Sequence, residues 1–540
     1  MPDQLTEAAL ANAREFVREG IAHITGQQAG CPSRFLVSSA PVPTALAMLA
    51  LTASGPVYTA NIAQGQSYLL STQHEDGWGN TPAEPNCELA TAICHKGLAA
   101  AESPSTVNGL IYDAAYLIAR TWTQDFDRLA PGWLPKQGSA LIKFLEAFTG
   151  KQLVPSLENL GLKDLASISH FMPPYGRPTI LAVTLIKEFY RQGLSREVAR
   201  ASGELLEWIS PNGSWCEDIV VTSLAIMALH LTGNATAAVN AAAWLCASQY
   251  DNGGWPSFNQ LTNWSVAWAA VILGPQDHNL RQAATAFLQA AANQDGSFGT
   301  AAPHSYPDLD DTAISLLGLA QNPKLNSTTL DKTSRLLLKL QNWDGSWGTF
   351  PSFTGTPPEC TCDFPVYIKS EDVTVHVIQA LLQIGLPKAN PAITKAVTWL
   401  VKRQQPDGTW NSTWFLGKTY ATAQVLDTLV ELIPDSAPVQ KGVAFLRAKQ
   451  CDGHWDMRSA GEAGLALYTL LKAGEPPHSA TIQSGLRYLR SIQKTDGSFY
   501  PSYSGFYASR LYYEEPLSEA MAALRAMAKY LDMLDASGPN

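Results

Sequence analysis

A short sequence phrase recurs along this chain and limits the folds that it can adopt. Most copies end an apolar segment, continue through Gln and a tight Asp-Gly or Asn-Gly turn, and close on an aromatic residue, as between Gln341 and Trp347. Glycine supplies the positive φ that ends a helix, the Gln amide can bond freed backbone groups, and the aromatic ring packs over the turn. Copies about 40 residues apart suit two helices and a turn per unit. The closing aromatic residues are Trp78, Trp215, Trp255, Phe298, Trp347, Trp410, Trp455 and Phe499.

The segments between these copies have the period of a helix, as residues 219–229 illustrate. We therefore predict an all-α fold in which helical hairpins are arranged in rings, as α-α barrels. From about residue 250 the copies are regular to the end of the chain, whereas no full copy is visible between Trp78 and Trp215. This difference predicts two barrels, of which the second is the more regular.

Composition limits the class of protein. The chain has 540 residues, of which 46% are hydrophobic and 16% charged, so we expect a globular protein with large buried cores and more than one domain. A net charge of -10 argues against a nucleic-acid partner. The first residues lack the basic and apolar regions of a signal peptide, and no apolar stretch is long enough to span a membrane. Eight scattered cysteines without a CxxC pair fit a reducing compartment, so we expect a cytoplasmic protein.

Three carboxyl groups fall within four residues, at Asp308, Asp310 and Asp311, just before the apolar run 313–317. One interpretation is a helix N-terminus, where Asp bonds free N–H groups and suits the helix dipole. The other is a proton donor, because carboxylates this close cannot all ionise cheaply and one stays protonated. In an apolar, aromatic-lined cavity such an acid can protonate an alkene. The motif alone leaves both interpretations open.

The repeated phrase and the acid cluster together resemble the QW repeats and the DxDD motif of class II terpene cyclases. Residues 370–376 are similar to the stretch of squalene-hopene cyclases in which an Asp and a His support the catalytic acid. The resemblance covers residues 200–540 well and the N-terminal part more loosely. The candidate substrate contacts lie in or near segments that resemble cavity-lining segments of the family. They are Trp264, Phe298, Tyr306, Trp414, Tyr420, Phe506 and Tyr513.

The N-terminal part favours one branch of this family. Residues 154–165 resemble the acidic region of copalyl diphosphate synthases, which keep the diphosphate of their substrate. Squalene-hopene cyclases lack that region and carry a membrane-inserting segment that is not evident here. The resemblance implies a βγ architecture, with a β domain from residues 1–24 and 251–540 that carries the DxDD motif. An inserted γ domain covers residues 25–250, and each domain is an α-α barrel.

The resemblance also implies roles for individual residues. Asp310 would protonate the terminal alkene of geranylgeranyl or farnesyl diphosphate, giving a bicyclic labdane- or drimane-type diphosphate. Asp308 and Asp311 would set its pKa and orientation. His376 would bond Asp310, and Asp372, four residues before His376 on the same helix face, would hold the imidazole. Aromatic rings would stabilise the positive charge during cyclisation.

The diphosphate would need positive charge around it. Arg510 is the candidate phosphate contact, and Glu158 with Asp164 could hold Mg²⁺, the expected cofactor, through water. The expected partner is a small prenyl diphosphate, with no nucleic acid and no transmembrane segment, and a homodimer is one assembly that we consider. The sequence leaves open whether the reaction ends by proton loss or by water capture.

Three other classes compete with this prediction. A squalene-hopene-type triterpene cyclase is the closest rival, and it differs in that its product carries no diphosphate. A zinc prenyltransferase β subunit uses the same barrel, and Cys360, Cys362, Asp363 and His376 could mimic its metal set, although this leaves the DxDD cluster unexplained. A non-catalytic helical scaffold would turn over no prenyl substrate.

Overall fold

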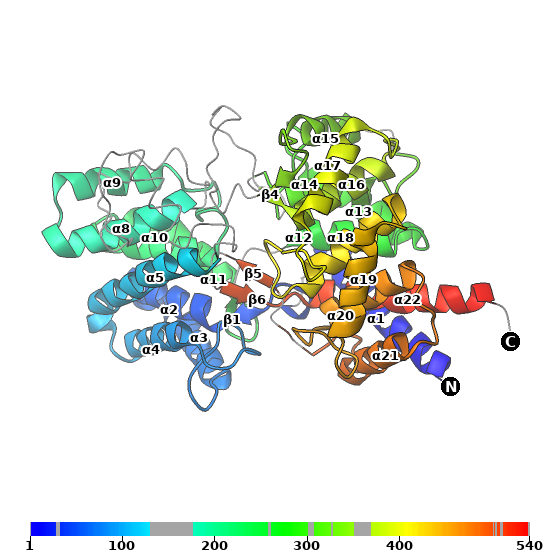
Figure 1. Ribbon diagram of the computed structural model, residues 1–540. Helices are drawn as coiled ribbons and strands as arrows, with labels where there is room; N and C mark the ends of the chain where they lie inside the picture. The colour runs from blue at the N-terminus through cyan, green and yellow to red at the C-terminus, as the bar shows by residue number, and fades with distance from the viewer. Residues whose placement is uncertain are drawn as a thin grey trace.

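The computed structural model describes residues 2–28, 33–129, 176–256, 261–300, 307–325, 328–349, 369–500, 502, 505–507 and 511–537. Across these residues nearly all regular structure is helical, in two groups of helices (Figure 1). No helix among them is long and apolar enough to cross a membrane. The short strands pair antiparallel, β1 (Ser39–Ala40) with β2 (Trp255–Pro256), β3 (Trp347–Gly348) with β4 (Lys369–Ser370), and β5 (Gly505–Tyr507) with β6 (Leu511–Tyr513).

Within the described part of the chain, six helices form the inner ring of the C-terminal group. Each contacts the next, and the last closes the ring by contacting the first. Most of their residues are buried, because apolar and small side chains occupy nearly every face rather than one stripe. They are α12 (Thr262–Ile272), α14 (Leu309–Leu319), α16 (Glu371–Gln383), α18 (Thr419–Leu432), α20 (Ala460–Lys472) and α22 (Pro516–Ser537).

An outer layer of amphipathic helices covers this ring. Each buries one stripe, as α13 does with Leu280, Ala284 and Leu288, and leaves its other face to solvent. Helix α1 (Pro2–Ile24) completes the layer, because it contacts α12, α13, α21 and α22. The other outer helices are α13 (His278–Ala291), α15 (Thr328–Lys339), α17 (Pro391–Arg403), α19 (Ala437–Lys449) and α21 (Ala480–Ile492).

The N-terminal group repeats this plan. Helices α2, α4, α5, α8 and α10 contact one another in that order, α10 returns to α2, and α3, α9 and α11 pack onto this set. The prediction of an all-α fold built from two α-α barrels is therefore confirmed. The bounds are α2 (Pro41–Ser54), α3 (Thr59–Ser71), α4 (Glu88–Glu102), α5 (Val107–Leu129), α8 (Gly176–Gln192), α9 (Arg196–Leu206), α10 (Ile219–Leu231) and α11 (Val239–Ala247).

The repeated phrase joins an outer helix, a turn and the next inner helix. Trp347 is fully buried, its Nε1 donates to the carbonyl of Leu337 at 2.8 Å, and its backbone N–H donates to Thr374 Oγ1 at 3.0 Å. Gln341 Nε2 donates to the carbonyl of Gly345 at 2.9 Å, and Gly345 has a φ of 99°. The indole bond to a leucine carbonyl recurs at Trp78, Trp215, Trp255, Trp410 and Trp455.

Two hydrophobic cores form, one from each group of helices. One combines Phe16 and Phe35 with residues between 264 and 530, and the other lies between residues 42 and 255. The chain passes between the cores at β1 and β2, which pair with each other. We propose that the cores mark the two domains. The chain then passes between them after Phe35 and after Trp255, beyond the expected boundaries after residues 24 and 250.

Candidate active site

The acid cluster lies where α14 begins. Asp308 is the N-cap, because its Oδ1 accepts hydrogen bonds from the backbone N–H of Asp310 at 2.7 Å and of Asp311 at 3.3 Å. Its own N–H donates to the carbonyl of Phe298 at 2.8 Å, which fixes the start of the helix against the preceding turn. The capping interpretation therefore applies to Asp308. The side chains of Asp310 and Asp311 are left for other roles.

All three carboxyl groups are buried, with 5–6% of each residue exposed. Burial raises the pKa of Asp308 well above its ordinary value, and the charge of Asp310 raises it further. Burial and the charges of Asp308, Asp310 and Glu515 do the same to the pKa of Asp311. Burial also raises the pKa of Asp310, although His376 opposes that rise. A raised pKa favours the neutral, protonated form of each acid.

His376, in α16, lies against the middle acid. Its Nδ1 is 2.6 Å from Asp310 Oδ1, and the imidazole is fully buried while the Asp310 side chain is 9% exposed. The rings of Trp264 and Trp268 lie edge to face against the imidazole, with centroids 5.6 and 5.8 Å from it. His376 Nε2 has no hydrogen-bond partner among the described residues. The Asp310 carboxyl is thus the one described partner of the imidazole nitrogens.

Asp372 does not hydrogen-bond His376, contrary to the expectation from their spacing. Its Oδ2 accepts from Ser412 Oγ at 2.5 Å and from the backbone N–H of Thr413 at 3.1 Å, and its Oδ1 accepts from Ser370 Oγ. Asp372 lies in the first turn of α16, where its carboxyl group reaches the neighbouring loop instead of the next helical turn. Its role in the structure is to hold that loop against α16.

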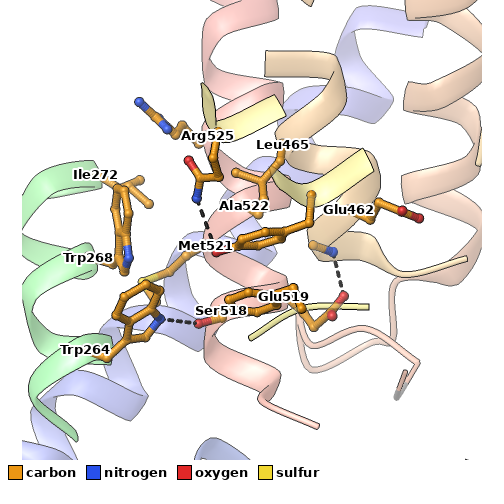
Figure 2. Close-up of a pocket in the computed structure, with 14 residues that line it drawn as sticks. Trp264, Trp268, Ile272, Glu462, Leu465, Ser518, Glu519, Met521, Ala522 and Arg525 are labelled. Atoms are coloured by element: carbon orange, nitrogen blue, oxygen red, sulfur yellow. Dashed lines mark hydrogen bonds between the residues drawn. The ribbon is translucent and has the colours of Figure 1, made fainter. Parts of the chain in front are cut away.

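A cavity opens between α12, α18, α20 and α22, next to the two indoles that contact His376. About 530 Å³ of space lies between its lining side chains, part of it continuous with solvent. Figure 2 shows Trp264 and Trp268 on one side, with Leu465 and Met521 across from them. The aromatic wall consists of Trp264, Trp268, Phe415 and Tyr420.

The predicted aromatic contacts differ in where the structure places them. Trp264 and Tyr420 line the cavity. Phe298, which packs in the C-terminal core, and Trp414, whose Nε1 donates to a threonine hydroxyl at 2.8 Å, do not line it. Tyr513 is buried, and after burial the nearby charges of Glu515 and of the acid cluster raise its pKa. Tyr513 therefore lies near the acids.

Several other predictions lie outside the described residues, namely Tyr306, Arg510, the metal candidates Glu158 and Asp164, and Cys360, Cys362 and Asp363 of the rival zinc set. Phe506 lies in β5, paired with Tyr512 of β6. In the part of the chain that the structure describes, no group of three or more His, Cys, Asp or Glu is placed to hold a metal ion. The expectations of Mg²⁺ and of an arginine for the diphosphate remain predictions.

Sequence reasoning missed several residues of the cavity wall. Trp268 follows Trp264 by four residues, and Gln424 follows Tyr420 by four. Because residues four apart share a helix face, the two predicted aromatics could have led to both. Phe415 directly follows the predicted Trp414. The charged residues of the wall, Glu462, Glu519 and Arg525, belong to segments in which we found no motif.

Glu462 in the cavity wall gives a prediction about pH. Burial is the largest cause that raises its pKa, from 4.5 to about 8. The folded protein thus holds this proton to a higher pH than the unfolded chain, so the wild type loses stability as pH rises from about 4.5 to 8. We expect Glu462→Gln to gain stability relative to the wild type across this window, by a few kcal/mol, and to level off above about pH 8.

Denaturant unfolding of both proteins at pH 5, 6.5, 8 and 9 measures this difference. Replacing the exposed Glu102 by Gln is the matched control and should change little with pH. A Glu462→Gln difference that stays constant from pH 5 to 9 would show that this carboxyl ionises normally.

Comparison with known proteins gives sequence relatives for the C-terminal region. Residues 297–532 match the family model described as the squalene-hopene cyclase C-terminal domain. The squalene-hopene cyclase of Zymomonas mobilis is 26% identical over 266 residues, which cover 43% of this chain and 40% of that protein. The squalene-hopene cyclase of Alicyclobacillus acidocaldarius is 27% identical over 228 residues, covering 37% and 36%. The chain thus spans two fifths or less of the length of these curated relatives.

A solved structure is similar over nearly the whole chain. The ent-copalyl diphosphate synthase from Streptomyces platensis is 19% identical, has a TM-score of 0.58, and covers 97% of this chain and 99% of its own. At this level of identity the likeness establishes a shared fold and leaves the chemistry to the site itself.

Proposed function

We propose that this chain, which belongs to the class II terpene cyclases and is related to the squalene-hopene cyclases, cyclises a linear prenyl diphosphate by protonating its terminal double bond. The substrate is geranylgeranyl or farnesyl diphosphate. The product is a bicyclic labdane- or drimane-type diphosphate in which the diphosphate is retained. The observation that carries this proposal is the buried contact of 2.6 Å between Asp310 and His376, whose imidazole packs against two indoles of the aromatic cavity wall.

Asp310 is the proton donor in this mechanism. Asp308 is occupied as a helix cap, and the pKa values of Asp308 and Asp311 are raised without an opposing imidazole. Because His376 lowers the pKa of Asp310 against the effect of burial, Asp310 gives up its proton most readily of the three. With Nδ1 as the donor, His376 stabilises the carboxylate that remains. The alkene π electrons form the new C–H bond, and the next double bond attacks the resulting carbocation.

The aromatic wall stabilises the carbocations that follow. An aromatic face can contribute up to about 2 kcal/mol to a cation in a dry site. Trp264, Trp268, Phe415 and Tyr420 all line the cavity. Burial raises the pKa of Tyr420 well above its ordinary value, so its hydroxyl stays neutral and offers no phenolate to trap the cation.

Retention of the diphosphate is the finer part of the proposal. It is supported by the resemblance of residues 154–165 to the acidic region of copalyl diphosphate synthases, and the shared fold is compatible with it. A diphosphate needs cations around it, so we propose Mg²⁺ as its counter-ion, with Glu158 and Asp164 as ligands and Arg510 as a phosphate contact.

Squalene cyclisation is the second candidate function. The match to the squalene-hopene cyclase C-terminal domain and the curated relatives favour it. Both candidates use the same acid and the same aromatic cavity, and they differ in whether the substrate carries a diphosphate.

One incubation separates these candidates. The purified chain with Mg²⁺ is given farnesyl diphosphate, geranylgeranyl diphosphate or squalene, and products are identified by mass spectrometry before and after phosphatase treatment. We expect a bicyclic diphosphate from one of the two diphosphates, which phosphatase converts to the alcohol. Cyclised squalene with unreacted diphosphates would establish the second function instead, and no turnover of any substrate would contradict both.

A further inference from the structure

Glu515 is a buried carboxyl group that serine hydroxyls hold in place. It directly precedes α22 and is 6% exposed. Its Oε1 accepts from Ser265 Oγ at 2.9 Å, and its Oε2 accepts from Ser518 Oγ at 2.7 Å. In the described part of the chain, no lysine or arginine pairs with it. Glutamine would bond the same two hydroxyls without burying an ionisable group, so the choice of glutamate needs another explanation.

A set of contacts connects Glu515 with the proposed proton donor. Ser518 Oγ, which donates to Glu515, also accepts from Trp264 Nε1 at 3.2 Å (Figure 2). The indole of Trp264 packs against the imidazole of His376, with ring centroids 5.6 Å apart. His376 Nδ1 in turn is 2.6 Å from Asp310 Oδ1. Glu515 therefore belongs to the immediate surroundings of the acid cluster.

Within the cluster, Asp311 is the acid that Glu515 affects. After burial and the charges of Asp308 and Asp310, the charge of Glu515 also raises the pKa of Asp311, whereas it is not among the causes for the other two acids. Asp311 Oδ1 is buried and has no hydrogen-bond partner among the described residues. The caps and partners of Asp308 and Asp310 are already fixed, so Asp311 is the member of the cluster placed to exchange a proton with Glu515.

On its other side, Glu515 is close to the cavity. Glu519 lies one helical turn later on the same face of α22, and it lines the cavity, part of which is continuous with solvent. Glu519 Oε1 accepts from Ser502 Oγ at 3.1 Å. Burial, and after it the charge of Glu519, raise the pKa of Glu515 to about 7 against the serine hydrogen bonds. Both protonation states of Glu515 are therefore populated near neutral pH, as a group that passes protons on requires.

The proposed chemistry creates a need for such a group. Asp310 is left as a carboxylate when the substrate takes its proton, and the next cyclisation cannot begin until a proton returns. Asp310 and Asp311 are only 5–6% exposed, so solvent does not reach them freely. A proton must then reach the cluster through neighbouring ionisable groups.

We propose that Glu515 is the relay that returns a proton to the acid cluster after each turnover, from the cavity wall at Glu519 to Asp311. The proposal rests on the proposed function. Asp311 gives its O–H proton to the Asp310 carboxylate, and Glu515 gives its own to the Asp311 carboxylate. A proton from solvent then restores Glu515 by way of Glu519. Each step breaks one O–H bond and forms another, so one solvent proton enters per turnover.

Comparison of the first turnover with later turnovers tests the relay. Glu515→Gln can keep both serine hydrogen bonds but cannot pass a proton on. Glu514→Gln is the matched control, because Glu514 is equally buried at 4% exposure. After burial, its pKa responds to Thr81, Ala83 and Ser38, which precede α4, rather than to the acid cluster. Rapid-quench kinetics with the substrate that the wild type cyclises give both rates.

We expect Glu515→Gln to form its first product within about twofold of the wild-type rate, because Asp310 is already protonated. Steady-state turnover should then be about tenfold slower or more, since the acid is recharged slowly. Acetate at constant pH and ionic strength should raise the steady-state rate several-fold, roughly in proportion to the protons that a small acid carries into the cavity, and should leave the first turnover unchanged. Glu514→Gln should match the wild type in both rates.

Three results would overturn the relay. Unchanged steady-state turnover in Glu515→Gln would mean that the acid is recharged by another route. An equal loss of the first and later turnovers would give Glu515 a structural role. A slow steady state that acetate does not change would indicate slow product release. A wild type that cyclises no substrate would instead contradict the proposed function, and the relay would fall with it.

Discussion

Replacing Asp310 by Asn should abolish cyclisation, with a fall in kcat of about 10³-fold or more, the upper range for removal of a general acid. The amide keeps the size of the side chain and can still accept from His376, but it has no proton acidic enough for an alkene. In the proposed function the aromatic wall and contacts to the diphosphate bind the substrate, so we expect KM to change far less than kcat. Initial rates at several substrate concentrations measure both constants.

The matched control for this substitution is Asp331→Asn, which changes an exposed aspartate in the first turn of an outer helix. It should leave kcat unchanged. The thermal midpoint of Asp310→Asn should equal or exceed that of the wild type, because a buried carboxyl with a raised pKa is replaced by a neutral group. Activity within a few fold of the wild type in a folded Asp310→Asn protein would remove Asp310 as the acid.

Replacing Trp347 by Ala should cost about 3–5 kcal/mol of unfolding free energy. The indole is fully buried, and its Nε1 donates to the carbonyl of Leu337 in the outer helix α15. The backbone N–H of Trp347, which alanine keeps, donates to Thr374 in the inner helix α16. The substitution would leave a cavity in the C-terminal core and an unpaired carbonyl at Leu337. The shift of the denaturant midpoint of the C-terminal barrel measures the loss.

The chain provides a control within the same repeat. Trp343 is four residues earlier and 76% exposed, so Trp343→Ala should cost well under 1 kcal/mol. Equal losses at the two positions would mean that the closing tryptophan of the phrase is not a core residue, and the repeat would then need a different physical explanation.

The repeated phrase made the fold predictable. A Gln, a positive-φ glycine and an indole each have a local physical role, and the structure shows these roles together at Gln341, Gly345 and Trp347. The acid cluster was predictable as a cluster, and its two interpretations turn out to apply to different residues. Asp308 caps α14, while Asp310 faces an imidazole from another helix.

Contacts between distant segments were harder to predict. The spacing of Asp372 and His376 is that of one helix face, yet the loop at Ser412 supplies the partners of Asp372. No local sequence pattern predicts a contact with a loop that lies 40 residues away in the sequence. The polar part of the cavity wall was missed for the same reason, because Glu462, Glu519 and Arg525 come from two helices that meet in the folded ring.

Turnover in D₂O tests most directly whether the reaction begins with protonation of a carbon-carbon double bond. We predict that every cyclised product molecule carries one deuterium, located by mass spectrometry and NMR. The deuterium should lie on the CH carbon of the terminal double bond, because protonation there leaves the cation on the dimethyl-substituted carbon. Cyclised product formed in D₂O without deuterium at that carbon would contradict an alkene-protonating acid.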